Sequence, residues 1–314
     1  MQSPAPAPEH RMTAVTWGLL GLLGLIWGAS YFFGRVAVAH VPAFTLVFLR
    51  VSIAALALHL FLHGRHGLYP ALRENALRFL LLGLVNNALP HSLIFLGQTQ
   101  IGAGLAAILN ATTPIWTVIF AHLSTSDERM TPNKIAGTLL GLTGTAVLIG
   151  PSAFSRLADG GETIPLWALL LPIGAAMSYG VAAIYGRRFR GLAAPVTATG
   201  QLTASTLIML PVMLVFDDPL ALPLPPLGTI LAVLALALIS TAFGYILFFR
   251  IMVRAGATNT TLVTLLVPPS AILFGILFLG EALGLNQIAG MALIFLGLAI
   301  LDGRLVNAVA RRSR

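Results

Sequence analysis

Long apolar runs separated by short polar stretches fill almost the whole chain. Each run is close to 20 residues long, the length at which an α-helix crosses a hydrocarbon core of about 30 Å. The runs are continuous and do not alternate between apolar and polar positions, which favours helices over the roughly 10-residue strands of a membrane β-barrel. The pattern predicts an all-α polytopic membrane protein with ten transmembrane helices. The ten runs span residues 14–34, 44–63, 77–97, 102–123, 132–150, 165–185, 195–215, 227–248, 257–279 and 286–303.

The composition agrees with a membrane protein. Of the 314 residues, 57% are hydrophobic and 9% are charged, and the mean hydropathy is +0.92, a balance that excludes a water-soluble domain. The first run follows a short polar leader. It is too long and too aromatic for a secretory signal and has no clear cleavage site, so we expect it to remain as the first span. The chain has no cysteine, which excludes disulfides and thiolate metal sites.

Basic residues are unevenly divided between the two predicted sides of the membrane. The net charge of +8 would by itself suggest a nucleic-acid partner. With the N-terminus in the cytoplasm, however, all of the 18 lysines and arginines except Arg35, Arg50 and Arg156 fall on the cytoplasmic side. This positive-inside distribution predicts a multi-pass protein of the inner (plasma) membrane with both termini cytoplasmic. Its tails are residues 1–13 and the basic stretch 304–314, and no nucleic-acid partner is expected.

The chain contains an internal repeat at an offset of 154 residues. It divides the protein into five helices at residues 14–150 and five at 165–303, with 151–164 as a periplasmic linker. An odd number of helices makes the second copy insert upside down, so the two halves are predicted to be inverted repeats. The matching positions are Gly102 with Gly256, Ala103 with Ala257, Pro114 with Pro268, Phe120 with Phe274, Leu123 with Leu277, Asp127/Glu128 with Glu281 and, one residue out of step, Gly137 with Gly290 and Gly144 with Gly297.

Four segments of the sequence carry a resemblance to a known family. They are WGASYFF in the first span, FLRVSIAALAL in the second, ILNATTPIWTVIFAHLSTSDERMTPNKIAGTLLGLTGTAVLIG in the fourth and fifth, and PPSAILFGILFLGEALGLNQIAG in the ninth and tenth. They resemble the two EamA domains of the drug/metabolite transporter superfamily, over about residues 14–303. The resemblance implies ten helices around a central cavity, and a carrier of small metabolites that is often an exporter of amino acids or related compounds.

A polar patch and a proline interrupt the fourth span. Asn110, Thr113 and Thr117 lie at i, i+3 and i+7 and therefore share one helix face. Pro114 removes a backbone hydrogen bond and frees the carbonyl of Asn110. Polar groups survive in hydrocarbon only where they face protein or water, so this face is predicted to line a cavity. The alternative is a packing kink whose polar groups are satisfied by neighbouring helices.

The third span carries a second polar stripe, formed by Asn87, His91 and Gln98 at i, i+4 and i+11. Apart from Arg50, His91 is the one titratable residue placed well inside the membrane. Because imidazole titrates near neutral pH, His91 is the candidate for proton coupling. The alternative is a neutral histidine hydrogen-bonded between helices.

No Asp or Glu falls inside any predicted span, although carriers of cations usually present a carboxylate. Neutral, zwitterionic or anionic substrates are therefore favoured. Trp27, Tyr31 and Arg35 form a stripe on the first span, and Arg50 lies about 10 Å into the second. Together they would attract a substrate carboxylate by bidentate pairing and cation–π contact. Alternatively, Arg35 extends to the interface and Arg50 holds helices together through carbonyls.

The remaining candidates are polar and aromatic residues of other spans, each of which would otherwise serve as a helix-to-helix contact. His59, His63 and His66 are interpreted as interfacial basic residues and not as a metal site, because no carboxylate lies near them in sequence. No metal or cofactor is expected. The complete set of predicted substrate-binding residues is Trp27, Tyr31, Arg50, Asn87, His91, Asn110, Thr113, Trp116, Tyr179, Gln201, Tyr245 and Thr264, with Pro114 and Pro268 as helix-breaking prolines of the cavity.

These features predict a secondary transporter, and not an enzyme, that moves a small amino acid or related zwitterionic or neutral compound by alternating access, with export as the expected direction. The alternative is an intramembrane enzyme acting on a lipid or isoprenoid. Such chemistry needs a clustered acid, base or metal set, whereas the spans offer one central histidine without an acidic partner. A channel is disfavoured because the chain lacks an evident pore helix or charged ring. Substrate identity, import versus export, coupling ion and oligomeric state stay open.

Overall fold

The computed structural model describes residues 13–124, 131–149, 164–189, 191–255, 260 and 263–302, and every regular element in them is helical. The predicted tails and linker, apart from Thr13 and Ile164, lie outside these residues, as do Asp127, Glu128, Gly256 and Ala257 of the repeat. The elements are α1 Ala14–Val38, α2 Ala43–Phe61, α3 Leu68–Glu74, α4 Ala76–Gly83, η1 Leu84–Ala88, α5 Leu89–Gln98, α6 Ala103–Asn110, α7 Thr113–Ser124, α8 Pro132–Ile149, α10 Leu166–Tyr185, η2 Gly186–Phe189, α11 Ala194–Phe216, α12 Leu227–Leu234, η3 Ala235–Phe243, α13 Gly244–Ala255, α15 Val263–Leu279 and α16 Leu285–Asp302.

Seven helical segments in the described part of the chain are long and apolar enough to cross a membrane. Two shorter apolar segments, Leu266–Leu279 and Leu285–Ile300, lie where the ninth and tenth spans were predicted. The all-helical membrane fold is therefore confirmed, while the number of ten spans stays a prediction. The seven segments are Ala14–Val38, Ala43–Phe61, Ala76–Gln98, Ala103–Ser124, Leu166–Phe189, Ala194–Phe216 and Leu227–Met252.

Local sequence signals set several helix boundaries. The hydroxyl of Thr13 caps α1 by accepting a hydrogen bond from the backbone N–H of Thr16 at 3.2 Å. Prolines immediately precede α2, α10 and α12, at positions whose backbone would not be helical in any case. The short helix α3, between the second and third spans, was not predicted because hydropathy does not distinguish a seven-residue helix from a loop.

Three of the long segments are not regular α-helices. The fourth span is interrupted at Ala111 and Thr112, between α6 and α7 and just before Pro114. The third and eighth spans each contain a π-helical stretch, η1 and η3. The π-helical stretch η1 has a local cause. Pro90 has no N–H to donate to the carbonyl of Asn86, and the proline ring crowds that carbonyl. Nothing in the sequence of η3 explains its widening.

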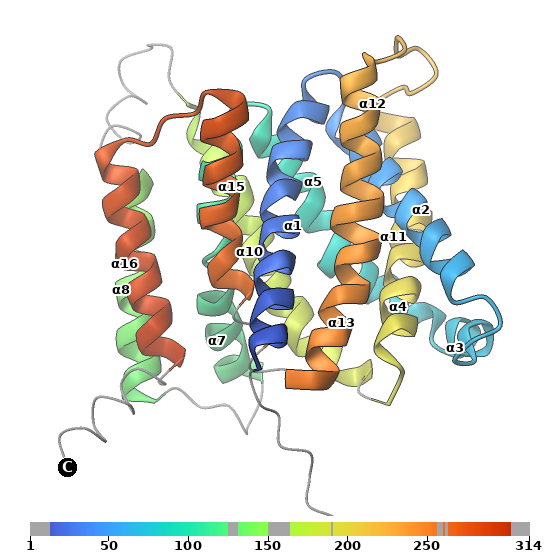
Figure 1. Ribbon diagram of the computed structural model, residues 1–314, viewed down its shortest axis with the longest axis horizontal. Helices are drawn as coiled ribbons and strands as arrows, with labels where there is room; N and C mark the ends of the chain where they lie inside the picture. The colour runs from blue at the N-terminus through green and yellow to red at the C-terminus, as the bar shows by residue number, and fades with distance from the viewer. Residues whose placement is uncertain are drawn as a thin grey trace, which may run out of the picture.

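Helix α1 stands at the centre of the helical array, with α15 on one side and α13 and α12 on the other (Figure 1). Helices α8 and α16 pack against each other at one edge of the molecule. Several of these approaches require a glycine. A Cβ on Gly28 would lie 2.8 Å from the backbone nitrogen of Ala271 in α15, so the two helices touch along their backbones.

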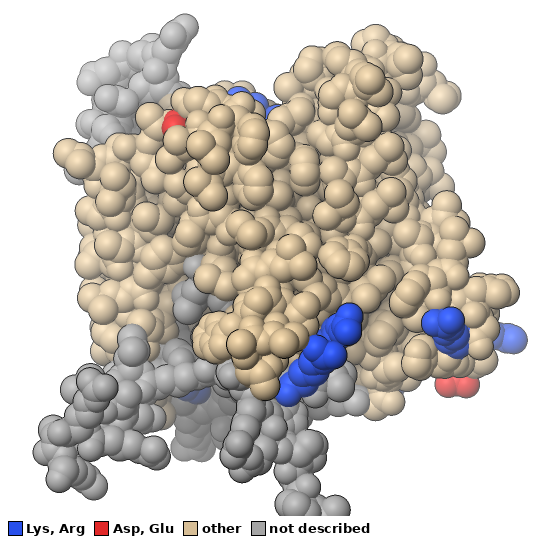
Figure 2. Space-filling view, viewed as in Figure 1, with Lys and Arg blue, Asp and Glu red and all other residues tan. Residues whose placement is uncertain are grey.

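Apart from Arg50 inside α2, the charged side chains of the described residues lie toward helix ends or in connecting segments. On the face drawn in Figure 2, a wide belt without charge separates them, and Lys and Arg gather at the lower edge over α13 and α3. Arg250 and Arg254 of α13 are exposed there. An uncharged belt bordered by charged residues is the surface expected of a protein that spans a bilayer.

Candidate functional site

A cavity of about 40 Å³ lies among α1, α2, α5 and α10. A volume of this size has room for water but is far below the roughly 150 Å³ at which an interior cavity accepts benzene. The volume of this cavity is too small for a metabolite. The lining residues are Ser30, Tyr31, Arg50, His91, Ile94, Phe95, Gln98 and Tyr179.

Arg50 brings a guanidinium group from α2 into this cavity. Its Nε donates a hydrogen bond to the hydroxyl of Thr241 at 3.0 Å, and its Cζ lies 5.8 Å from the centre of the Phe95 ring. The hydroxyl of Thr241 in turn donates to the carbonyl of Leu236 at 2.8 Å, inside η3. Both partners hold the guanidinium without neutralising it, because a hydroxyl and an aromatic face carry no net charge.

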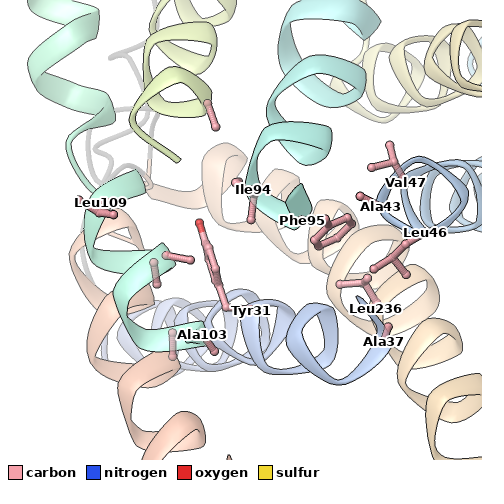
Figure 3. Close-up of a cluster of buried hydrophobic side chains, with 14 of the residues drawn as sticks. Tyr31, Ala37, Ala43, Leu46, Val47, Ile94, Phe95, Ala103, Leu109 and Leu236 are labelled. Carbon is pink, nitrogen blue, oxygen red and sulfur yellow. The ribbon is translucent and has the colours of Figure 1, made fainter. Parts of the chain in front are cut away.

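Tyr31 connects three elements around the cavity. Its phenol oxygen accepts a hydrogen bond from Asn110 Nδ2 at 2.8 Å, and its backbone carbonyl accepts one from Gln98 Nε2 at 2.8 Å. Figure 3 shows Tyr31 rising from α1 between α6, which carries Leu109, and α5, which carries Ile94 and Phe95. Because the phenol accepts from Asn110, its own proton remains available to another acceptor.

Unsatisfied polar atoms concentrate near this site. In the described part of the chain, six buried side-chain polar atoms have no hydrogen-bond partner. A buried group without a partner costs about 1–3 kcal/mol, so such groups need an explanation. Two of them, His91 Nδ1 and Gln98 Oε1, belong to residues that line the cavity. The others are Asn87 Nδ2, Asn110 Oδ1, Trp116 Nε1 and Thr138 Oγ1.

Of the twelve predicted binding residues, Tyr31, Arg50, His91 and Tyr179 line the cavity. Three other predicted residues, Asn87, Tyr245 and Gln201, are not in its lining and make side-chain hydrogen bonds to residues of other helices. Tyr245 donates to Asn87 Oδ1 at 3.4 Å, and Gln201 Oε1 accepts from Asn86 Nδ2 at 2.7 Å.

Thr113 is engaged within its own span. Its hydroxyl donates at 2.8 Å to the carbonyl of Asn110, the group that Pro114 was predicted to free. The freed carbonyl is therefore satisfied by Thr113, which gives Thr113 a local structural contact.

The two tryptophans pack against neighbouring rings. Trp27 stacks on Phe248 with ring centroids 5.5 Å apart, and Trp116 stacks on Phe120 at 6.3 Å.

Thr264 and Pro268 lie in α15, which continues as one helix through Pro268 and Pro269. The second copy thus has no helix break of the kind that separates α6 from α7.

Sequence reasoning did not single out Ser30, Ile94 or Phe95 as lining residues. Phe95 lies one turn after His91 and stacks on it with ring centroids 6.4 Å apart, so the spacing was available as a signal. His59, His63 and His66 are not among the residues that line the cavity. His59 Nε2 contacts the Thr203 hydroxyl at 2.9 Å, and within the described residues no group of three metal-ligating side chains forms.

Comparisons with known proteins agree on one family. The EamA-like transporter family matches residues 14–150 and 166–301. "Uncharacterized transporter YoaV" of Bacillus subtilis is 24% identical, over 91% of this chain and 96% of its own length. "Uncharacterized inner membrane transporter YedA" of Escherichia coli K12 is 27% identical, over 88% and 86%.

Two further similarities extend the comparison. A Streptantibioticus cattleyicolor protein named "Probable terminal-alkyne amino-acid exporter" is 24% identical, over 94% of this chain and 95% of its own length. A solved crystal structure superposes with a TM-score of 0.60 at 22% identity, covering 90% of this chain and 96% of the other, a likeness that bears on the fold alone. The relatives' names agree with the prediction of a carrier and not an enzyme.

Proposed function

The chain belongs to the EamA-like transporter family of the drug/metabolite transporter superfamily, and from this premise we propose that it exports a small amino acid or related zwitterion across the inner membrane by alternating access. The observation that carries the proposal is Arg50, a cation in an interior cavity that no Asp or Glu lines. A substrate carboxylate would supply the missing negative charge through a bidentate pair.

The acceptors around Arg50 suit the other end of a zwitterion. Gln98 Oε1 and Asn110 Oδ1 are buried acceptors without a donor in the described chain. An ammonium group carries three donors and would satisfy them, with the Tyr179 ring as a further cation–π surface. The lining offers these uncharged amide oxygens and no carboxylate. A carrier of simple cations would present a carboxylate, so a zwitterion is favoured. The name of the S. cattleyicolor relative is in line with this substrate class.

We place the substrate between two inverted repeats of five helices, residues 14–150 and 165–303, joined by a periplasmic linker at 151–164 and flanked by cytoplasmic tails at 1–13 and 304–314. Shifted by the repeat offset of 154, η1 falls on residues 238–242, inside η3. Two spans predicted to be equivalent therefore carry the same irregularity, which supports a repeated architecture.

Close contacts between helices repeat in the same way. A Cβ on Gly28 would meet Ser270, and a Cβ on Gly180 would meet Trp116. Gly28 and Gly180 are 152 residues apart, the same separation as the starts of the two family matches. Their contact partners, Ser270 and Trp116, are 154 residues apart, which is the repeat offset. Such reciprocal pairs are expected when two copies are related by a pseudo-twofold axis in the membrane plane.

The small cavity fits one step of alternating access. A space of about 40 Å³ is closed to a metabolite, so the two halves must move apart on one side before a substrate enters. The break between α6 and α7 and the π-helical stretches are places where a helix bends without losing every backbone hydrogen bond.

The test is a ligand screen by thermal shift on the purified protein in detergent, comparing amino acids with their amides, nucleosides, polyamines and quaternary cations. We expect stabilisation by amino acids that is weaker for their amides. Arg50→Gln should remove the preference for the carboxylate, while the control Arg250→Gln, at an exposed arginine of α13, should keep it. Selective stabilisation by cations, or equal loss for acids and amides in Arg50→Gln, would overturn the proposal.

A further inference from the structure

Arg50 is a charged side chain of the interior without an acidic partner in the described chain. None of the acidic residues that the structure describes lines the cavity. They lie at helix ends or in connecting segments, and two of them are engaged in helix capping. The cavity has room for water, but an interior charge without a counter-ion is still unfavourable. The described acidic residues are Glu74, Asp217, Asp218, Glu281 and Asp302.

The substrate carboxylate proposed above does not resolve this problem in the conformation at hand. A cavity of about 40 Å³ is smaller than an amino acid, yet the guanidinium lines it. Between transport events the charge of Arg50 therefore needs a counter-ion of nearly the size of water. Chloride is the abundant anion that meets this description.

The cavity also offers the donors that a small anion requires. Tyr31 keeps its phenol proton free, because its oxygen already accepts from Asn110. The Tyr179 hydroxyl makes no hydrogen bond within the described residues, and it lines the same cavity. His91 presents Nδ1 without a partner, and as the Nδ1–H tautomer this nitrogen donates. These donors share the lining with one guanidinium, and Gln98 Oε1 is the one acceptor without a partner among the described lining residues.

From this arrangement we propose that the cavity is a binding site for a small monovalent inorganic anion, chloride in the cell, held by Arg50, Tyr31 and Tyr179 when no substrate is present. The anion balances the charge of Arg50 in the closed conformation. It occupies the position at which a substrate carboxylate would meet the same guanidinium, so the two compete. This competition rests on the proposed function, whereas the anion site itself does not.

The experiment measures thermal unfolding of the purified protein in sodium chloride, sodium bromide and sodium isethionate at equal ionic strength. Isethionate is a bulky sulfonate that a cavity of this volume excludes. We expect saturable stabilisation by chloride and bromide over isethionate, because an ion that binds the folded state raises its apparent stability. The halide shift should be lost in Arg50→Gln, reduced in Tyr179→Phe and unchanged in Arg250→Gln, at an exposed arginine of α13 outside the cavity lining. Equal unfolding temperatures in the three salts would overturn the proposal.

A second measurement covers the case in which Arg50→Gln does not fold. Crystals of the unaltered protein grown in bromide should show an anomalous peak beside the Arg50 guanidinium, and a peak only elsewhere would overturn the assignment. The proposed function is tested separately, by titrating an amino acid in chloride and in isethionate. The apparent affinity of the protein for the amino acid should be severalfold weaker in chloride than in isethionate. Stabilisation by halides without any response to amino acids would reject the substrate class and keep the anion site. A response to amino acids without stabilisation by halides would reject the anion site alone.

Discussion

Arg50 and Thr241, 191 residues apart in the sequence, meet through a hydrogen bond of 3.0 Å from the guanidinium Nε to the threonine hydroxyl. The first lies in α2 and the second in η3, so the bond joins the two segments matched by the family. Thr241 donates in turn to the carbonyl of Leu236. The position of the cavity's positive charge therefore depends on the π-helical geometry of η3.

Replacing Thr241 by valine tests this dependence. Thr241→Val keeps the shape of the side chain but removes the acceptor for Arg50 Nε, at about 1 kcal/mol of stability. We expect the KM for the transported substrate to rise severalfold, because the guanidinium loses its fixed orientation, with a smaller change in kcat. Transport into proteoliposomes measures both. Thr206→Val is the control, since that hydroxyl donates only to Leu202 of its own helix, and equal effects of the two changes would contradict the prediction.

Asp217 links two helices that are distant in sequence. Its Oδ2 accepts from the backbone nitrogen of Thr45 at 2.6 Å and from the Thr45 hydroxyl at 2.9 Å, at the N-terminus of α2. Asp217→Asn removes the charge from these bonds and should lower the free energy of unfolding by about 1 kcal/mol. The adjacent, exposed Asp218 supplies the control in Asp218→Asn. Unfolding in detergent should separate the two variants, and matching curves would exclude the capping role.

Glu281 caps α6 in a similar way. Its carboxylate accepts from the backbone nitrogens of Ala103 at 2.6 Å and Gly104 at 3.0 Å. A Cβ on Gly102 would lie 2.6 Å from that carboxylate, so Gly102→Ala should displace it and cost about 1–2 kcal/mol, the range for losing an N-cap. In the double variant Gly102→Ala with Glu281→Gln, the loss of unfolding free energy should be smaller than the sum of the two single losses. Gly228→Ala, at a position with open space, should not destabilise the protein.

The backbone contact between α1 and α15 gives a prediction about packing. A Cβ at Gly28 would meet Val267 O at 2.9 Å as well as the Ala271 nitrogen, and backbone atoms cannot move aside as a side chain does. Gly28→Ala should therefore destabilise the protein by about 1–3 kcal/mol and reduce transport. Gly21→Ala on the same helix meets nothing within 4 Å and should be neutral or slightly stabilising. The prediction is wrong if the two variants unfold alike.

His91 is the only histidine in the lining of the cavity. If protons drive export, they should pass through this imidazole, and His91→Asn should flatten the pH dependence of substrate flux. Flux into proteoliposomes across pH 5–8 is the measurement. His59→Asn is the control, because His59 contacts Thr203 away from the cavity. A pH dependence that persists in His91→Asn would remove His91 from the coupling mechanism.

The sequence located the helices well because a bilayer leaves few alternatives. Backbone groups in hydrocarbon must pair within their own segment, so an apolar run near 20 residues becomes a helix wherever it occurs. A proline did not by itself decide where a helix breaks, because the fourth span is interrupted before Pro114 whereas α15 continues through Pro268 and Pro269. The π-helical widening of η3 could not be foreseen, since its apolar sequence suits an α-helix equally well.

The choice of residues around the cavity was decided by tertiary structure. Asn87 and His91 share one predicted stripe, yet His91 lines the cavity while Asn87 pairs with Tyr245 of another helix. Spacing along a helix fixes which side chains share a face, but the direction of that face depends on how the helix rotates and packs against its neighbours. The sequence by itself therefore determined the helical membrane fold, the repeat and a set of polar candidates. Only the packing of distant helices brought Tyr31, Arg50, His91 and Tyr179 into one cavity, because that arrangement depends on contacts between residues far apart in the chain.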